Sequence, residues 1–85
     1  MTNKPWNEDR KALRELLKEL RKDKAGLTQA ELSRALGKPQ SYVSKYEIGE
    51  RNLDYVEVME ICKVLHISPE KFNTLYEQKT QRPTE

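Results

Sequence analysis

A short predicted helix over residues 39–48 carries hydrogen-bonding side chains on its outer face, with Val43 and Tyr46 on the inner face. Amides and hydroxyls can read base edges in the DNA major groove, and a lysine can reach guanine or a phosphate. The pattern therefore predicts a base-contacting set, although any surface helix also shows a polar outer face. The residues of this set are Gln40, Ser41, Ser44 and Lys45.

A second predicted helix, over residues 28–36, comes immediately before this one. The connection at Gly37-Lys38-Pro39 is too short for two antiparallel helices, so it predicts a steep crossing. Leu32 and Leu36 face inward, and the small side chain of Ser33 suits the close approach at the crossing. The two helices together are typical of a helix-turn-helix, which occurs both in DNA-binding proteins and elsewhere.

Apolar residues recur at helical spacing along the chain, and we expect an all-α fold of one domain over residues 8–78. Thr28 with Glu31 and Asp54 with Glu57 form two capping boxes, and Pro39 suits a first helical position. The predicted ends are a flexible arm over residues 1–7 and a polar tail over residues 79–85. The expected five-helix bundle has helices at about 8–23, 28–36, 39–48, 54–65 and 69–78.

The inner stripe of the predicted fourth helix is expected to consist of Tyr55, Val58, Cys62 and Leu65. Cys62 also lies four residues before His66, so both could face one metal ion. Zinc needs three or four ligands, and the chain has no other cysteine or histidine. We therefore expect Cys62 in the core and His66 at a helix end, with no metal and no cofactor.

Composition limits the remaining function classes. The 85 residues carry a net charge of +2, but residues 1–52 hold 12 Lys/Arg against 8 Asp/Glu, which favours a polyanionic partner for this half. No uncharged stretch approaches the ~20 residues of a membrane span, and the single cysteine fits a reducing, cytoplasmic location. Without a phosphate loop or a catalytic pair, we expect no enzyme.

The stretch TQAELSRALGKPQSYVSKYEIGERNLDYVEVMEICKVLHISPEKF, residues 28–72, resembles the Cro/CI-like (XRE) family of helix-turn-helix DNA-binding domains. The likeness extends from about Leu13 to Phe72. It implies a repressor-type domain of five helices that binds double-stranded operator DNA, usually as a dimer. The base-facing positions of this family match the set Gln40, Ser41, Ser44 and Lys45.

The resemblance also implies a phosphate-contacting role for Gln29, beside Thr28, and Lys38, Tyr42 and Arg51 lie where they could hold the DNA backbone on either side. Glu47 is expected to brace the helix against the first helix, by pairing with Arg21 or Lys22. The choice is open because there is one residue more than usual between Leu20 and Gly26. His66 stands at a turn position that is often glycine.

These observations predict a sequence-specific regulator of transcription, a repressor that acts as a homodimer. Leu75 and Tyr76 extend beyond the expected core, so they belong either to a dimer interface or to simple packing. An alternative is an antitoxin-type module whose main partner is another protein, a toxin or a second regulator. A third reading is a domain that keeps the fold but has lost DNA binding.

Overall fold

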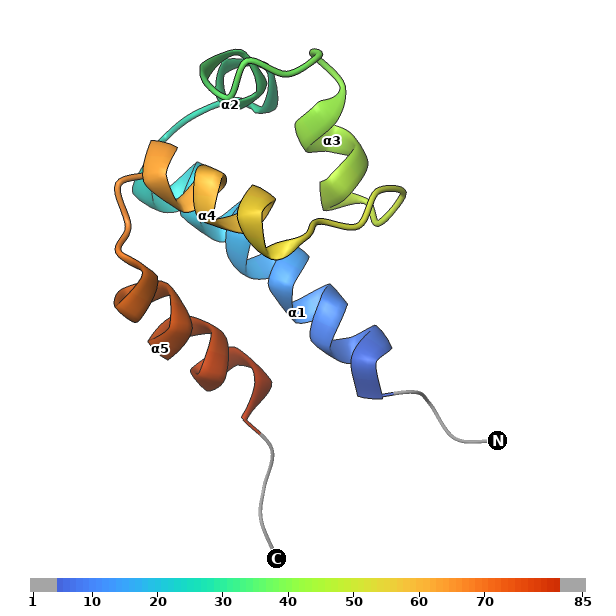
Figure 1. Cartoon of the computed structure of the whole chain (residues 1–85), viewed down its shortest axis with the longest axis vertical. Helices are drawn as coiled ribbons and strands as arrows, with labels where there is room; N and C mark the ends of the chain where they lie inside the picture. Colours follow the sequence, from blue (N-terminus) through green and yellow to red (C-terminus); the bar gives the residue numbers. More distant parts are fainter. Residues whose placement is uncertain (1–4, 82–85) are drawn as a thin grey trace, which may run out of the picture.

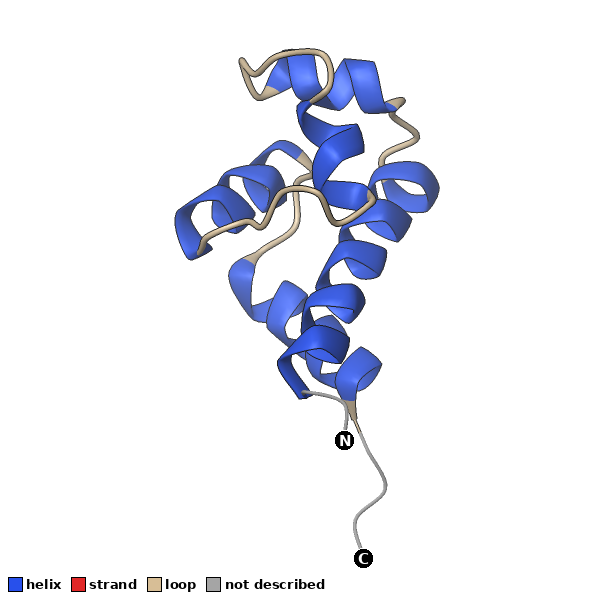
Figure 2. Cartoon of the chain, turned by 90° about the vertical axis from the view of Figure 1, so that its right-hand side faces the viewer, coloured by secondary structure: helices blue, strands red, loops and turns tan. Residues whose placement is uncertain are grey.

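The computed structural model describes residues 5–81, which form a bundle of helices with no strand in that range (Figures 1 and 2). The all-α prediction is confirmed. No helix among these residues is both long and apolar enough to cross a membrane. The elements are α1 (Pro5–Glu19), the π-helix η1 (Leu20–Lys24), α2 (Gln29–Ala35), α3 (Tyr42–Glu47), α4 (Tyr55–Val64) and α5 (Pro69–Thr80).

Helices α2 and α3 lie at one end of the molecule, away from the start of α1 and the end of α5 (Figure 1). Helices α1 and α5 pack along each other at the opposite end, and α4 packs against α5 (Figures 1 and 2). This arrangement leaves one side of the α2–α3 pair exposed, while α3 packs against α1 on the other side.

Side chains cap several helices as the sequence predicts. The Thr28 hydroxyl accepts from the Glu31 backbone N–H at 3.0 Å, and the Glu31 carboxylate accepts from the Thr28 N–H at 2.9 Å. Asp54 and Glu57 repeat this exchange at 2.8 and 2.9 Å. Each box satisfies N–H groups that a helix start would otherwise leave unpaired, so the starts of α2 and α4 are fixed by local chemistry.

The predicted ends of the first and last helices were wrong by a few residues. Helix α1 begins at Pro5 rather than residue 8, so residues 5–7 are helical and do not belong to an arm. Helix α5 continues to Thr80, two residues into the predicted tail. The remainder of the predicted arm and tail, residues 1–4 and 82–85, lies outside the described residues.

The predicted start of the third helix at Pro39 was also wrong, because α3 begins at Tyr42. The Pro39 carbonyl accepts from the Tyr42 N–H at 2.9 Å, which closes a single turn instead of starting a helix. Ser41 then takes the N-cap position with no side-chain hydrogen bond to the helix. Gln40 and Ser41 therefore lie in the turn ahead of α3 and not on it.

The hydrophobic core lies where α1, α3 and α4 meet. Tyr46, Leu17 and Leu32 are fully buried in it. On α4 the buried residues are Val58, Ile61 and Cys62, whereas Tyr55 is 74% exposed, so its predicted inward position was wrong. Leu53, just before the helix, packs against the core instead, and the apolar stripe of α4 therefore starts one turn after Tyr55.

The chain between Leu20 and Gly26, where we expect one residue more than usual, is wound into the π-helix η1. The Ala25 N–H donates to the Leu20 carbonyl at 3.0 Å, five residues back instead of the four of an α-helix. This wider turn takes up one residue without a loop. The side chain of Arg21, in η1, consequently stays buried against the rest of the fold.

Candidate nucleic-acid interface

The four predicted base-contacting residues lie on one side of the molecule, in two different settings. Gln40 and Ser41 are exposed in the turn before α3, while Ser44 and Lys45 lie on the helix itself. Gln29, from the start of α2, joins Gln40, Ser41 and Ser44 around a shallow hollow of about 370 Å³. Lys45 is exposed but does not line this hollow.

The Ser44 hydroxyl donates to the Ser41 carbonyl at 3.1 Å. While this hydrogen bond is kept, the Ser44 oxygen can offer only lone pairs to a ligand. Gln40 retains both its amide donor and its amide acceptor on the exposed surface, the combination that binds adenine with two hydrogen bonds. Of the four residues, Gln40 therefore has the most specific hydrogen-bonding chemistry.

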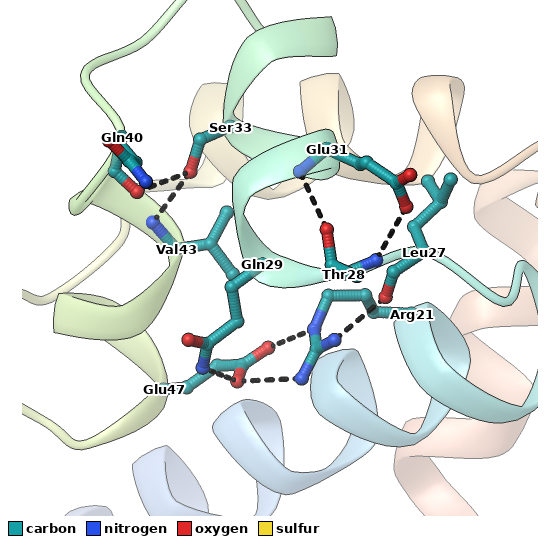
Figure 3. A network of polar contacts seen from close by, with 9 residues as sticks. All are labelled: Arg21, Leu27, Thr28, Gln29, Glu31, Ser33, Gln40, Val43 and Glu47. Carbon is teal, nitrogen blue, oxygen red and sulfur yellow. Dashed lines mark hydrogen bonds and ion pairs between the residues drawn. The ribbon is translucent and has the colours of Figure 1, made fainter.

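Ser33 holds the crossing of α2 and α3 at a fixed geometry. Its hydroxyl accepts from the Val43 backbone N–H at 3.2 Å and donates to the Gln40 carbonyl at 3.3 Å (Figure 3). The side chain is fully buried, so both contacts are shielded from water. Because these bonds hold the backbone of the turn, the Gln40 side chain remains available to solvent. The predicted role of the small residue at the crossing is thus extended to a hydrogen-bonding one.

Glu47 ties α3 to the first helix, as predicted, and its partner is Arg21 rather than Lys22. The Arg21 Nε and Nη2 groups donate to the two Glu47 carboxylate oxygens at 2.7 and 3.1 Å (Figure 3). The two side chains are only 7% and 2% exposed. Arg21 Nη1 also donates to the Leu27 carbonyl at 2.7 Å, so the guanidinium links the π-helix, the following loop and α3.

Gln29 belongs to the same polar network. Its amide nitrogen donates to a Glu47 oxygen at 2.7 Å, which fixes the side chain against α3 (Figure 3). An amide NH₂ group carries two hydrogens, so one remains for a phosphate. The predicted phosphate contact is compatible with this geometry. Thr28, beside it, is exposed, but its hydroxyl and its backbone N–H are both engaged in the capping box.

Tyr42, predicted to contact the DNA backbone, is not on the surface. Its side chain is buried, with 7% exposure, and its ring meets the Tyr46 ring edge-on at 5.7 Å between centroids. The Lys38 ammonium lies 5.5 Å and the Arg51 guanidinium carbon 5.1 Å from the centre of the Tyr42 ring. The ring thus holds two predicted phosphate-contacting cations by cation–π attraction, and does not itself extend outward.

Burial raises the pKa of the Tyr42 phenol, with Glu57 adding to the effect. Arg51 forms an ion pair with the Glu57 carboxylate. The backbone N–H of Asp54 is the main group that lowers the pKa of Glu57, and Arg51 adds to it. Glu57 therefore remains ionised and keeps a negative charge beside Arg51 at neutral pH.

The sequence reasoning missed Arg34, which lines a second hollow of about 280 Å³ with Ala30, Lys38 and Gln40. Its exposed position on α2, four residues after Ala30, could have indicated this, because residues four apart share one helix face. With Lys38 it makes the neighbourhood of Gln40 positively charged.

The remaining predicted residues lie outside this surface. Leu75 and Tyr76 are half-buried and pack against the core, and the Tyr76 hydroxyl donates to the Asp9 carbonyl at 3.1 Å. Cys62 is buried, and this burial raises the pKa of its thiol to about 11. His66 is exposed at φ 60°, the left-handed conformation expected at this turn. Residues 5–81 bring together no group of three potential metal ligands.

The fold and the α2–α3 geometry define a helix-turn-helix domain. The helix-turn-helix family model matches residues 17–72, about two thirds of the chain. The chain therefore belongs to this helix-turn-helix family, of the Cro/CI-like (XRE) type, and is a DNA-binding domain of the kind found in transcription regulators. No curated protein and no solved structure matches the chain.

Proposed function

We propose that this protein is a sequence-specific regulator of transcription, a repressor, that reads the major groove of double-stranded DNA with α3 and the turn before it. The observation that carries the proposal is the exposed hydrogen-bonding set around Gln40, whose backbone is held by the buried Ser33 hydroxyl. A rigid backbone lets amide and hydroxyl groups meet base edges without reordering.

Cations lie beside this set as phosphate contacts require. Lys38 is held on the Tyr42 ring at the start of the turn, and Arg51 is held on the same ring from the loop after α3. Phosphate contacts fix the orientation of a protein on the duplex, while base contacts give the sequence preference. Both cations lie at the Tyr42 ring, at the start of α3, and can set the register of the reading surface on the duplex.

The proposed active form is a homodimer on operator DNA. A single domain offers four candidate base-contacting side chains, and two copies on half-sites about 34 Å apart would double that number. Leu75 and Tyr76 of α5 are the proposed interface, through the parts of these half-buried side chains that α1 does not cover. If the protein binds as such a dimer, the DNA sequence that it selects should be palindromic.

A second candidate function is an interaction module, such as an antitoxin, whose main partner is another protein. Tyr55 and Val56 are adjacent on the first turn of α4 and are 74% and 62% exposed, and Ile48 is 65% exposed. Exposed apolar groups of this size favour a protein contact. A co-purifying partner whose binding is lost on Tyr55→Ser substitution would support this function.

The test of DNA reading starts with selection of bound duplexes from a random pool. Affinities are then measured on the selected duplex and on random duplex for Gln40→Ala and for Gln78→Ala, an exposed glutamine on α5 that serves as the matched control. We expect Gln40→Ala to cost about 1–3 kcal/mol on the selected duplex and little on random duplex.

Two results would contradict the proposal. An equal loss on both duplexes would show that Gln40 does not read bases. A pool that yields no enriched sequence would show that the protein does not recognise a DNA sequence. Gln78→Ala should behave like the unchanged protein on both duplexes.

A further inference from the structure

Three arginines from two separate parts of the chain gather at the C-terminal end of α3. Arg10 and Arg14 come from α1, and Arg51 comes from the loop after α3. They line a small hollow of about 10 Å³, which is roughly the space of one water-sized atom. Tyr46 and Asn52 line the same hollow. None of the contacts described above for bases or phosphates involves Arg10 or Arg14.

Gly49 permits the close approach of Arg14 to this end of α3. A Cβ atom on Gly49 would lie 3.2 Å from the Arg14 guanidinium carbon, and the residue has φ +90°. Both the backbone conformation and the limited space therefore favour glycine here. The Arg14 guanidinium is thus packed on the backbone at the helix end instead of extending freely into solvent.

The charge of the cluster is only partly balanced. Arg51 is paired with Glu57, but neither Arg10 nor Arg14 forms an ion pair with any residue in the described part of the chain. Three guanidinium groups thus share one close carboxylate. Guanidinium groups bind phosphate oxygens with paired hydrogen bonds, so an anion with several oxygens suits the cluster.

The Tyr46 hydroxyl is a buried donor beside the cluster. Tyr46 is fully buried, and its hydroxyl is the one buried side-chain polar atom without a hydrogen-bond partner among residues 8–81. Burial is the main cause that raises its pKa, so the group stays protonated. Tyr46 lines the hollow, but its hydroxyl is closed to solvent, so the anion-binding groups of the site are the arginines.

We propose that Arg10, Arg14 and Arg51 form an oxyanion site that binds one backbone phosphate of the DNA, beyond the C-terminal end of α3. The inference rests on the proposed function, because it assumes that a duplex lies against α3. The site extends the contact surface from the helix-turn-helix onto α1. The hollow has room for about one water, so the phosphate is expected to lie over its rim. A single phosphate is expected because all three arginines line this one hollow.

The test measures the salt dependence of duplex affinity for Arg14→Gln, Arg10→Gln and the double variant. Each phosphate contact contributes about 0.9 to the slope of log affinity against log salt concentration. We expect each single variant to lower the slope, and the double variant to lower it by about 0.9 for each protomer bound, on selected and random duplex alike. Lys71→Gln, an exposed lysine on α5, removes the same charge and should leave the slope unchanged.

A wild-type slope in both single variants would overturn the inference while leaving the proposed function intact. A loss in the double variant of about 1.8 for each protomer bound, twice the single-contact value, would also overturn it, since each protomer would then bind two phosphates. Failure of the unchanged protein to bind any duplex would instead refute the proposed function itself, and this site with it. Arg10 is exposed, so Arg10→Gln decides the question if Arg14→Gln fails to fold.

Free anions are tested separately by thermal unfolding in inorganic phosphate and in chloride at equal ionic strength. If phosphate stabilises the unchanged protein but not Arg14→Gln, while the DNA salt slopes of the two are equal, the site binds a free oxyanion and the DNA assignment is wrong. If the slope falls in the variant, the phosphate of the DNA backbone is the ligand.

Discussion

Removal of the Arg21 side chain should be among the most destabilising single changes in this domain. In Arg21→Met, the Glu47 carboxylate keeps the hydrogen bond from Gln29 but loses its cation while remaining buried. Breaking a buried pair in this way costs about 3–5 kcal/mol. A domain of this size has a total stability of about 4–13 kcal/mol, so a large share of it would be lost.

Urea unfolding followed by circular dichroism measures this loss. The control is Lys79→Met, which breaks the pair between Lys79 and Glu19 at 2.9 Å, with side chains 25% and 54% exposed. An exposed pair contributes less than about 1 kcal/mol. The double change Arg21→Met with Glu47→Leu should recover much of the stability, because it removes both buried charges together.

The reasoning would be refuted if Arg21→Met lost no more stability than Lys79→Met. It would also fail if the double variant were less stable than Arg21→Met alone, since the cost would then not come from an unpaired carboxylate. The double variant Arg21→Met with Glu47→Leu also allows DNA binding to be measured in a protein that is still folded. Once folded, it should bind DNA more weakly than the unchanged protein, because α3 is no longer tied to the π-helix by an ion pair.

Three further changes probe other features. Ser33→Ala should cost about 1–3 kcal/mol in urea unfolding, because the buried Val43 N–H loses its acceptor, whereas Ser41→Ala on the surface should cost much less. His66→Gly should stabilise by about 0.5–1 kcal/mol, since φ 60° costs a side chain about 1–2 kcal/mol and the greater freedom of glycine in the unfolded chain offsets about 0.5–1 kcal/mol of it; a loss in the same assay would contradict this. Burial raises the pKa of Cys62 to about 11, above the roughly 8.5 of an unfolded thiol, so its contribution to stability is complete below pH ~8.5 and is lost as pH rises toward 11. The stability difference between the unchanged protein and Cys62→Ala should shrink over that range, and a constant difference would show that the thiol does not ionise on unfolding.

Local chemistry made most of the fold predictable from the sequence. The capping residues Thr28 and Asp54 act through neighbours three residues away, so their hydrogen bonds can be read from spacing alone. Glu47 was also predictable as an inward brace, because of its place at the end of the helix and its family position. The choice between Arg21 and Lys22 depended on the winding of the chain before Gly26, and spacing alone does not determine that winding.

The errors come from contacts between distant segments. Pro39 is a good first residue of a helix by its own preference, but the Ser33 hydroxyl holds the following turn and α3 starts later. Tyr42 has the position of an outer residue in the helical pattern, yet two cations from other segments cover its ring. The arginine cluster could not be predicted from spacing, because it joins α1 to the loop after α3.

The π-helix gives this fold an unusual tolerance of chain length. An inserted residue normally rotates everything after it by about 100° around the helix axis, and Arg21 would then lose its alignment with Glu47. Here the π-helix makes one turn wider, and the guanidinium reaches its carboxylate at 2.7 Å. A residue added at the end of α1 and wound in the same way would leave the α2–α3 pair in place.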